Sequence, residues 1–377
     1  MFGMLFPVVA ALSGVLAAAA PPRLHVAHPQ SAGGADIVAT ATRGDRAWLL
    51  RLDLRAARVT AAIELQKLST QLCSSADGSR VAVQADDSVL VFALGADGAM
   101  IRVASLPAKV FGDVDHRDIE PRQLIAGGER LVASDTENGT TLIADLAAAK
   151  PRWRHVPTDP DVLSEDGRLC FWREDDRVGR CDDPKRGRPI TLDADPSLNF
   201  DGGPPSSLAP RFLGPDVLLF SVSYDASLTA ESCAYGALTG KLRWSFPSWT
   251  PSRHFPQPDG TVWITGEPSS EPDPPSGLRA LDPRDGAVKQ LLTVDDGDFY
   301  PGSVSIADGV LYAAGECGLF PIRRFRLADA ERLPDLTASD VSGWPGSAPA
   351  RPLTPPRAAP SSPRRSPGAA RTGAPAP

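Results

Sequence analysis

The sequence of 377 residues lacks the short patterns that mark several large protein classes. It has no Gly-x-Ser-x-Gly motif of a serine nucleophile, no phosphate-binding glycine loop and no dinucleotide-binding fingerprint. After the N-terminal segment, no stretch of ten or more residues has the clean apolar period of an amphipathic helix. A nucleic-acid-binding motif is also absent. These absences argue against the common hydrolase, nucleotide-binding and helical classes.

Charged residues divide the chain into an acidic body and a basic end. The whole chain has a formal net charge of −7, and residues 341–377 contain five arginines and no acidic residue, which leaves about −12 on the rest. This end is rich in proline and cannot bury enough apolar surface to fold, so we expect residues 337–377 to form a disordered tail. A solvated spacer is the favoured role, and contact with anionic polymers or lipid headgroups is the alternative.

The N-terminal stretch is apolar and uncharged. Met1 to Pro22 contains no charged side chain, and the apolar run ends in small residues, which is typical of a secretory signal peptide. The stretch is also long enough to cross a bilayer, so a membrane anchor is the alternative. We therefore predict a signal peptide or anchor at residues 1–20 and an exported protein, periplasmic or extracellular.

A turn-and-strand module recurs along the chain. Residues 233–246 predict a strand, a tight turn at Gly240 and a second strand, because glycine adopts the positive φ that such turns need. Residues 282–286 repeat the pattern of residues 236–240, with a glycine at the end of each. Such anchors occur at positions 53, 95, 145, 183, 236, 282 and 329, with a mean spacing of 46 residues. A four-stranded propeller blade has about this period.

Short β-rich runs lie between these anchors. Residues 217–223, 261–265 and 310–314 are apolar and β-rich, and glycine, proline or aspartate bounds them. The repeat content therefore predicts an all-β fold. We expect a β-propeller over residues 21–336, with seven blades of four-stranded sheet.

The repeat resembles that of quinoprotein-type propellers, whose blades carry pyrroloquinoline-quinone-like repeats. The likeness rests on the Asp-Gly turn and strand of residues 259–263, on residues 278–286, and on the turn and strand of residues 240–244. It implies the propeller fold and no particular activity. Quinoprotein dehydrogenases place adjacent cysteines over their cofactor, and this chain has no Cys-Cys dipeptide. We therefore expect no cofactor.

A looser likeness extends to the propeller lipoprotein of the outer-membrane β-barrel assembly machinery. No cysteine lies near the end of the apolar N-terminal stretch, so the lipid attachment of that protein is not expected here. Tryptophans of the repeat are interpreted as packing residues, because a large flat ring buries much area between blades. These residues are Trp153, Trp244 and Trp263.

Two acidic clusters are the candidate metal sites, because each could supply carboxylate oxygens to Ca²⁺. Neither has the spacing of a known calcium-binding loop, so solvated acidic side chains are the favoured interpretation. The candidate ligands are Asp113, Asp115, Asp118, Asp295, Asp296 and Asp298. The five histidines are interpreted as exposed loop residues, and we predict no catalytic residue.

The five cysteines suit an oxidising compartment. A hairpin with Asp175 and Asp176 in its turn would place Cys170 opposite Cys181, at a separation that a disulfide can span. We therefore predict this disulfide, with two buried thiols as the alternative. The sequence does not assign the other three cysteines.

The function expected from these features is non-catalytic binding. We predict an exported scaffold that binds a protein partner or a cell-envelope polymer through the loops on one face of the propeller. Membrane contact is expected only through the N-terminal segment or the basic tail. One alternative is a metal-assisted enzyme of the lactonase or hydrolase type, which requires the acidic clusters to converge. The other is a structural protein that its tail tethers to the envelope.

Overall fold

A computed structural model describes most of the chain between residues 25 and 345. The described residues are 25–65, 68–85, 87–108, 119–135, 139–156, 162–164, 166–172, 177–180, 183–189, 207–214, 216–224, 229–247, 249–257, 259–268, 277–294, 301–315 and 318–345. The chain divides into two compact units, residues 1–343 and residues 344–377, and every strand lies in the first. None of the described segments forms a helix with the length and hydropathy needed to cross a membrane.

The described residues form seven four-stranded antiparallel sheets that follow one another along the chain. The strands of the first four sheets are β1 (His25–Ser31), β2 (Asp36–Arg43), β3 (Arg46–Asp53), β4 (Arg58–Leu65); β5 (Leu68–Ser74), β6 (Arg80–Ala85), β7 (Ser88–Leu94), β8 (Met100–Pro107); β9 (Ile119–Ile125), β10 (Arg130–Asp135), β11 (Thr140–Asp145), β12 (Trp153–His155); and β13 (Val162–Leu163), β14 (Leu169–Trp172), β15 (Arg177–Arg180), β16 (Asp183–Pro189).

The strands of the last three sheets are β17 (Ser207–Leu213), β18 (Val217–Tyr224), β19 (Thr229–Gly236), β20 (Leu242–Pro247); β21 (Trp249–Pro256), β22 (Val262–Pro268), β23 (Gly277–Leu281), β24 (Val288–Thr293); and β25 (Pro301–Ala307), β26 (Val310–Gly315), β27 (Ile322–Arg326), β28 (Arg332–Leu336). In every sheet the strands are hydrogen-bonded in chain order, so each sheet is a simple meander.

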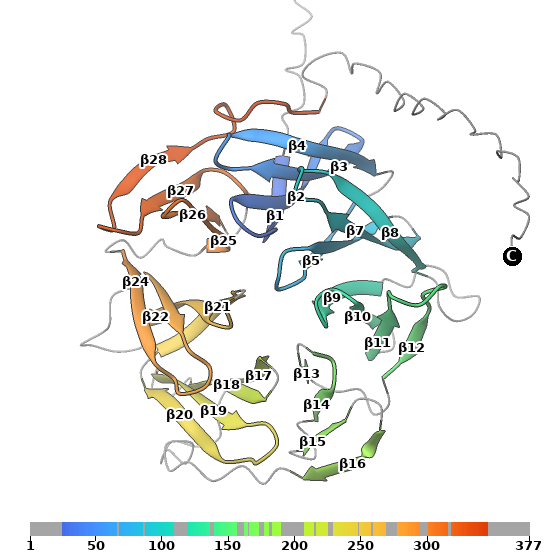
Figure 1. The fold of residues 1–377 in the computed structure, drawn as a ribbon, viewed down its shortest axis with the longest axis vertical. Helices are drawn as coiled ribbons and strands as arrows, with labels where there is room; N and C mark the ends of the chain where they lie inside the picture. The colour runs from blue at the N-terminus through green and yellow to red at the C-terminus, as the bar shows by residue number, and fades with distance from the viewer. Residues whose placement is uncertain are drawn as a thin grey trace, which may run out of the picture. The chain divides into compact units, whose positions relative to one another are not determined.

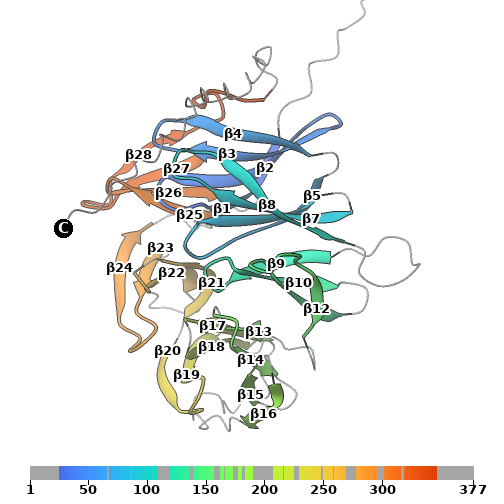
Figure 2. The ribbon, with the colours of Figure 1, turned by 45° about the vertical axis from the view of Figure 1, so that its right-hand side comes forward.

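Within the first unit the sheets are arranged around a common axis, with the first strand of each sheet innermost and the fourth outermost (Figure 1). First strands of neighbouring sheets contact one another, including β1 with β5 and β5 with β9. The first and the last sheet lie side by side in both views (Figure 2), and β1 contacts β25. This arrangement is a β-propeller, which confirms the expected all-β fold.

The turns that defined the repeat adopt the expected geometry. Gly240 has φ +68°, and its N–H donates to the Gly236 carbonyl at 2.8 Å. Gly286 has φ +74°, and its N–H donates to the Asp282 carbonyl at 2.9 Å. The predicted hairpin of β19 and β20 is therefore confirmed.

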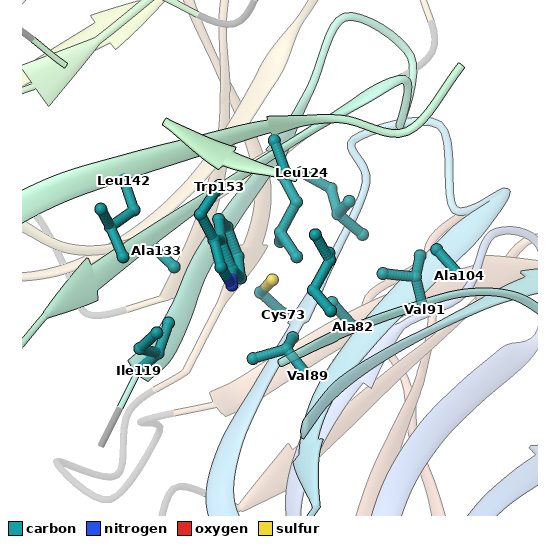
Figure 3. Packing of buried hydrophobic residues seen from close by; sticks show 13 residues of the cluster. Cys73, Ala82, Val89, Val91, Ala104, Ile119, Leu124, Ala133, Leu142 and Trp153 are labelled. Carbon is teal, nitrogen blue, oxygen red and sulfur yellow. The ribbon is translucent and has the colours of Figure 1, made fainter. Parts of the chain in front are cut away.

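All three tryptophans pack between sheets, as the sequence predicts. Trp153 belongs to a cluster formed by the second and third sheets (Figure 3), and its indole N–H donates to the Pro107 carbonyl at 2.8 Å. Trp244 packs against residues of the fifth and sixth sheets and donates to the Pro283 carbonyl at 3.2 Å. Trp263 lies in a cluster shared by the sixth and seventh sheets.

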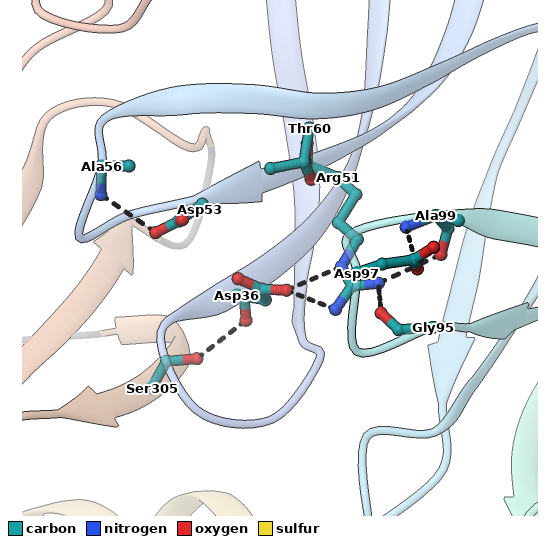
Figure 4. Close-up of polar contacts among 9 residues, drawn as sticks. All are labelled: Asp36, Arg51, Asp53, Ala56, Thr60, Gly95, Asp97, Ala99 and Ser305. Atoms are coloured by element: carbon teal, nitrogen blue, oxygen red, sulfur yellow. Dashed lines mark hydrogen bonds and ion pairs between the residues drawn. The ribbon is translucent and has the colours of Figure 1, made fainter.

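The ion pair between Arg51 and Asp36 connects the first sheet to both of its neighbours (Figure 4). Arg51 is only 5% exposed, and its Nε donates to Asp36 Oδ2 at 2.7 Å. Its Nη1 donates to the carbonyls of Gly95 at 2.5 Å and Ala99 at 3.1 Å, in the second sheet. On the other side, the Ser305 hydroxyl of the seventh sheet donates to the Asp36 carbonyl at 3.2 Å.

The chain that follows β28 returns to the first sheet. The Ser342 N–H donates to the Ala57 carbonyl at 2.9 Å, and the Val59 N–H donates to the Ser342 carbonyl at 2.9 Å. Val341 beside them is buried. Residues 337–343, here called the strap, therefore join the end of the last sheet to the outer strand of the first.

The strap changes the boundary that composition suggests for the tail. We expected the tail to start at residue 337, but the first compact unit continues to residue 343. Composition misses this because the strap binds through its backbone and one buried valine, which an average over residues does not register.

The β14–β15 hairpin differs from the expected register. Cys170 lies opposite Gly179, not opposite Cys181. The observed register pairs Phe171 with Val178, and both are buried, so core packing sets the register and the turn residues do not. Cys170 takes part in a disulfide bond. Cys181 lies outside the described residues, so its pairing with Cys170 stays a prediction.

The contact between Trp244 and the turn at Gly286 gives a matched pair of variants. A Cβ at position 286 would lie 2.5 Å from Trp244 Cγ, whereas a Cβ at Gly309 meets no atom within 4 Å. Both glycines have positive φ, +74° and +73°, so alanine costs about 1–2 kcal/mol at either site. Gly286→Ala should lose a further 1–3 kcal/mol, roughly, through overpacking. Urea unfolding measures this, and equal losses in the two variants would contradict the packing.

Candidate binding site

The two faces of the propeller differ in how the strands are connected. Because successive strands are antiparallel, the turns after first and third strands lie on one face, here called the turn face. Asp77, Asp166 and Asp259 each accept a hydrogen bond from the backbone N–H two residues later, at 2.9–3.0 Å. Hydrogen bonds from the hydroxyl and the backbone amide of Thr261 lower the pKa of the Asp259 carboxyl and so favour its ionised form. The turn face is thus built from short, internally bonded turns.

Arginines also connect neighbouring turns on this face. Arg80 Nη1 donates to the Gly128 carbonyl at 2.8 Å, from the second sheet to the third. Arg130 Nη1 donates to the Gly167 carbonyl at 3.2 Å, from the third sheet to the fourth. A face fixed in this way has little freedom to adapt to a partner.

The opposite face, here called the loop face, receives the connections after second and fourth strands. The longest of these are residues 109–118, 190–206, 269–276 and 295–300, which lie outside the described residues. They follow β8, β16, β22 and β24. Long connections on a rigid scaffold are the usual carriers of binding residues.

The predicted metal ligands fall in two of these connections. Asp113, Asp115 and Asp118 follow β8, and Asp295, Asp296 and Asp298 follow β24, all outside the described residues. Whether they converge therefore stays untested. In the part of the chain that the structure describes, no group of three or more histidine, cysteine, aspartate or glutamate side chains is placed to hold a metal ion.

A basic cluster lies on two innermost strands. Arg211 is on β17, and Arg253 and His254 are adjacent on β21. A guanidinium nitrogen of Arg211 contacts His254 Nδ1, which joins the fifth sheet to the sixth. Both arginines keep exposed side chains, and His254 is half-buried.

The contact with Arg211 fixes the tautomer of His254. A guanidinium only donates hydrogen bonds, so Nδ1 must be the acceptor and the ring proton sits on Nε2. Nε2 is buried and has no hydrogen-bond partner in the described residues. The imidazole therefore holds Arg211 from one side and stays neutral.

The electrostatics of the cluster follow from burial and like charge. Burial, followed by the charge of Arg211, lowers the pKa of His254 well below its usual range. Burial, followed by the charge of Arg253, lowers the pKa of the Arg211 guanidinium. The Arg211 guanidinium is therefore partly desolvated, although its side chain keeps contact with solvent.

The structure corrects the interpretation of the histidines as loop residues. His25, His155 and His254 all lie in strands, and His254 is half-buried. Sequence reasoning also missed Arg211 and Arg253. The signal that could have found them is a charged residue in the first strand of a repeat, since that strand lies nearest the axis.

Comparisons with known proteins support the fold and go no further. No family model and no curated protein sequence matches the chain. The structure is similar to an uncharacterized protein from Listeria monocytogenes, with 10% identity and a TM-score of 0.51, over 82% of this chain and 94% of that one. The repeat type therefore remains a resemblance.

Weaker matches include two proteins with described propellers or activities. The β-propeller domain of the Trilobed protease from Pyrococcus furiosus is 11% identical, with a TM-score of 0.47, over 83% of this chain and 98% of that one. The periplasmic gluconolactonase PpgL of Pseudomonas aeruginosa is 13% identical, with a TM-score of 0.45, over 84% and 96%. At this similarity they say nothing about activity.

The neutral state of His254 predicts a pH dependence of stability. The unfolded chain gains a proton at His254 as the pH falls below about 6.5, and the folded chain does not, so folding stability falls below that pH. Between pH 8 and pH 5, His254→Asn should lose about 2 kcal/mol less folding stability than the wild-type protein. Urea unfolding at both pH values measures this. The exposed His25→Asn variant is the control, and a change there as large as in His254→Asn would contradict the assignment.

Proposed function

We propose that the seven sheets form one closed ring of seven blades, and that this propeller is an exported, non-catalytic scaffold. Its loop face binds a protein partner or a polymer of the cell envelope. The apolar, uncharged stretch from Met1 to Pro22 supports export. The body of the chain has no enzyme motif in its sequence, which favours binding over catalysis.

The observation that carries the proposal is the difference between the two faces. The turn face consists of short turns that bond to themselves and to their neighbours. The connections at 109–118, 190–206, 269–276 and 295–300 all enter and leave through the loop face. The two longest of them, 109–118 and 190–206, follow the fourth strands β8 and β16 and so belong to this face, and long connections on a rigid scaffold usually carry the binding residues.

The test is affinity capture from an envelope extract with the full chain and two variants. Replacing residues 190–206 by a glycine-serine sequence of equal length should abolish recovery of the partner, because it removes the longest connection of the loop face. Leu238→Ser is the control, since Leu238 is the most exposed large apolar residue of the described chain, at 73%, and lies on the turn face. Equal recovery by the loop variant would overturn the proposal.

The basic tail needs its own control. A chain that ends at residue 345 removes the tail but keeps the strap, so its partners should match those of the full chain. Loss of the partner with this truncation would assign binding to the tail and contradict a role for the loop face.

A further inference from the structure

The basic cluster at Arg211, Arg253 and His254 has features of a ligand site that its structural role does not require. One contact, from Arg211 to His254, is enough to join β17 to β21. It uses one donor of the Arg211 guanidinium. A guanidinium has five N–H donors, so most of its hydrogen-bonding capacity is left for another acceptor.

No acidic side chain neutralises Arg211 within the described residues. The buried Arg51 differs in this respect, because it is paired with Asp36. The groups that influence Arg211 are instead a second cation, Arg253, and a neutral imidazole. A guanidinium that lacks a carboxylate partner can take an oxyanion of a ligand as its counter-charge.

Rigid backbone holds the cluster in place. Arg211 pairs with Leu219 of β18, and His254 pairs with Ile264 of β22; both partner residues are buried. The paired strands and the contact between Arg211 and His254 position these two side chains before any ligand arrives, which lowers the entropy lost on binding.

The cluster is separate from the loop face. Arg211 and His254 both lie near the ends of their strands, where β17 leads to β18 and β21 leads to β22. They are therefore closer to the turn face than to the connections proposed to bind a partner.

We propose that the inner edge between the fifth and sixth sheets binds a small ligand through an oxyanion group, a carboxylate or a phosphate. Arg211 contacts the two oxygens with its remaining donors in the bidentate geometry that suits a planar guanidinium. His254 is a positioning residue, because its Nδ1 holds one side of Arg211.

Isothermal titration with inorganic phosphate and with acetate tests this inference, on the full chain in chloride buffer of constant ionic strength. At least one of the two anions should bind at millimolar concentration or below. The anion that binds more tightly shows whether the oxyanion group of the ligand is a phosphate or a carboxylate. Arg211→Gln should weaken that binding by about tenfold to a hundredfold, the loss expected for a charged hydrogen bond. Arg211→Lys should keep part of the affinity, because it keeps the charge and loses the planar fork.

Arg102→Gln is the matched control, since Arg102 is exposed on the outer strand β8. Far-ultraviolet circular dichroism and the urea midpoint show whether each variant folds. If Arg211→Gln does not fold, Arg211→Lys takes its place in the comparison of affinities. No binding of either anion, or equal losses in Arg102→Gln and Arg211→Gln, would overturn the inference. The loop variant should still bind the anion, so failure of this inference and failure of the scaffold proposal give different results.

Discussion

A four-stranded sheet cannot bury its own two faces, so each sheet of this protein depends on its neighbours to cover its apolar side chains. β2, β6 and β10 each contain a run of consecutive buried residues. Because side chains of a strand alternate between faces, such a run requires cover on both sides. The apolar clusters accordingly lie between sheets, as with Trp153 between the second and third. Burial is worth about 25 cal/mol per Å² of apolar surface, and a sheet that loses a neighbour exposes a whole face. The sheets are therefore stable only as a set.

This dependence makes the junction of the first and last sheets decisive. Here two elements distant in sequence must meet, and the described residues hold them with polar as well as apolar contacts. Ser305 bonds to the Asp36 backbone while the Asp36 side chain neutralises the buried Arg51. On the outside, the strap pairs Ser342 with the backbone beside Arg58. The basic cluster also depends on contact between sheets, because Arg211 belongs to the fifth sheet and His254 to the sixth.

The repeat was accessible from sequence because its signals are local. A glycine at the end of a four-residue turn requires positive φ whatever surrounds it, and Gly240 and Gly286 both have it. The tryptophans were accessible because a large apolar residue in a half-exposed strand needs a neighbouring blade. The register of the β14–β15 hairpin at Cys170 could not be predicted from the sequence, because the burial of Phe171 sets this register and the turn residues do not. The contact of Arg211 with His254 could not be predicted either, because the two residues are 43 positions apart and no local sequence pattern brings them together. Contacts between residues distant in sequence leave no such local signal, which is why the fold could be predicted from the sequence more readily than the basic cluster.

The proposed ring requires the strap to hold the last sheet against the first. The most direct measurement compares the unfolding free energy of two truncated chains, one ending at residue 345 and one ending at residue 336. The account predicts that the longer chain unfolds like the full protein in a single transition. The shorter chain should be less stable by about 1–3 kcal/mol, because it loses two backbone hydrogen bonds and the buried Val341. Equal stability of the two truncated chains would show that the strap does not close the ring.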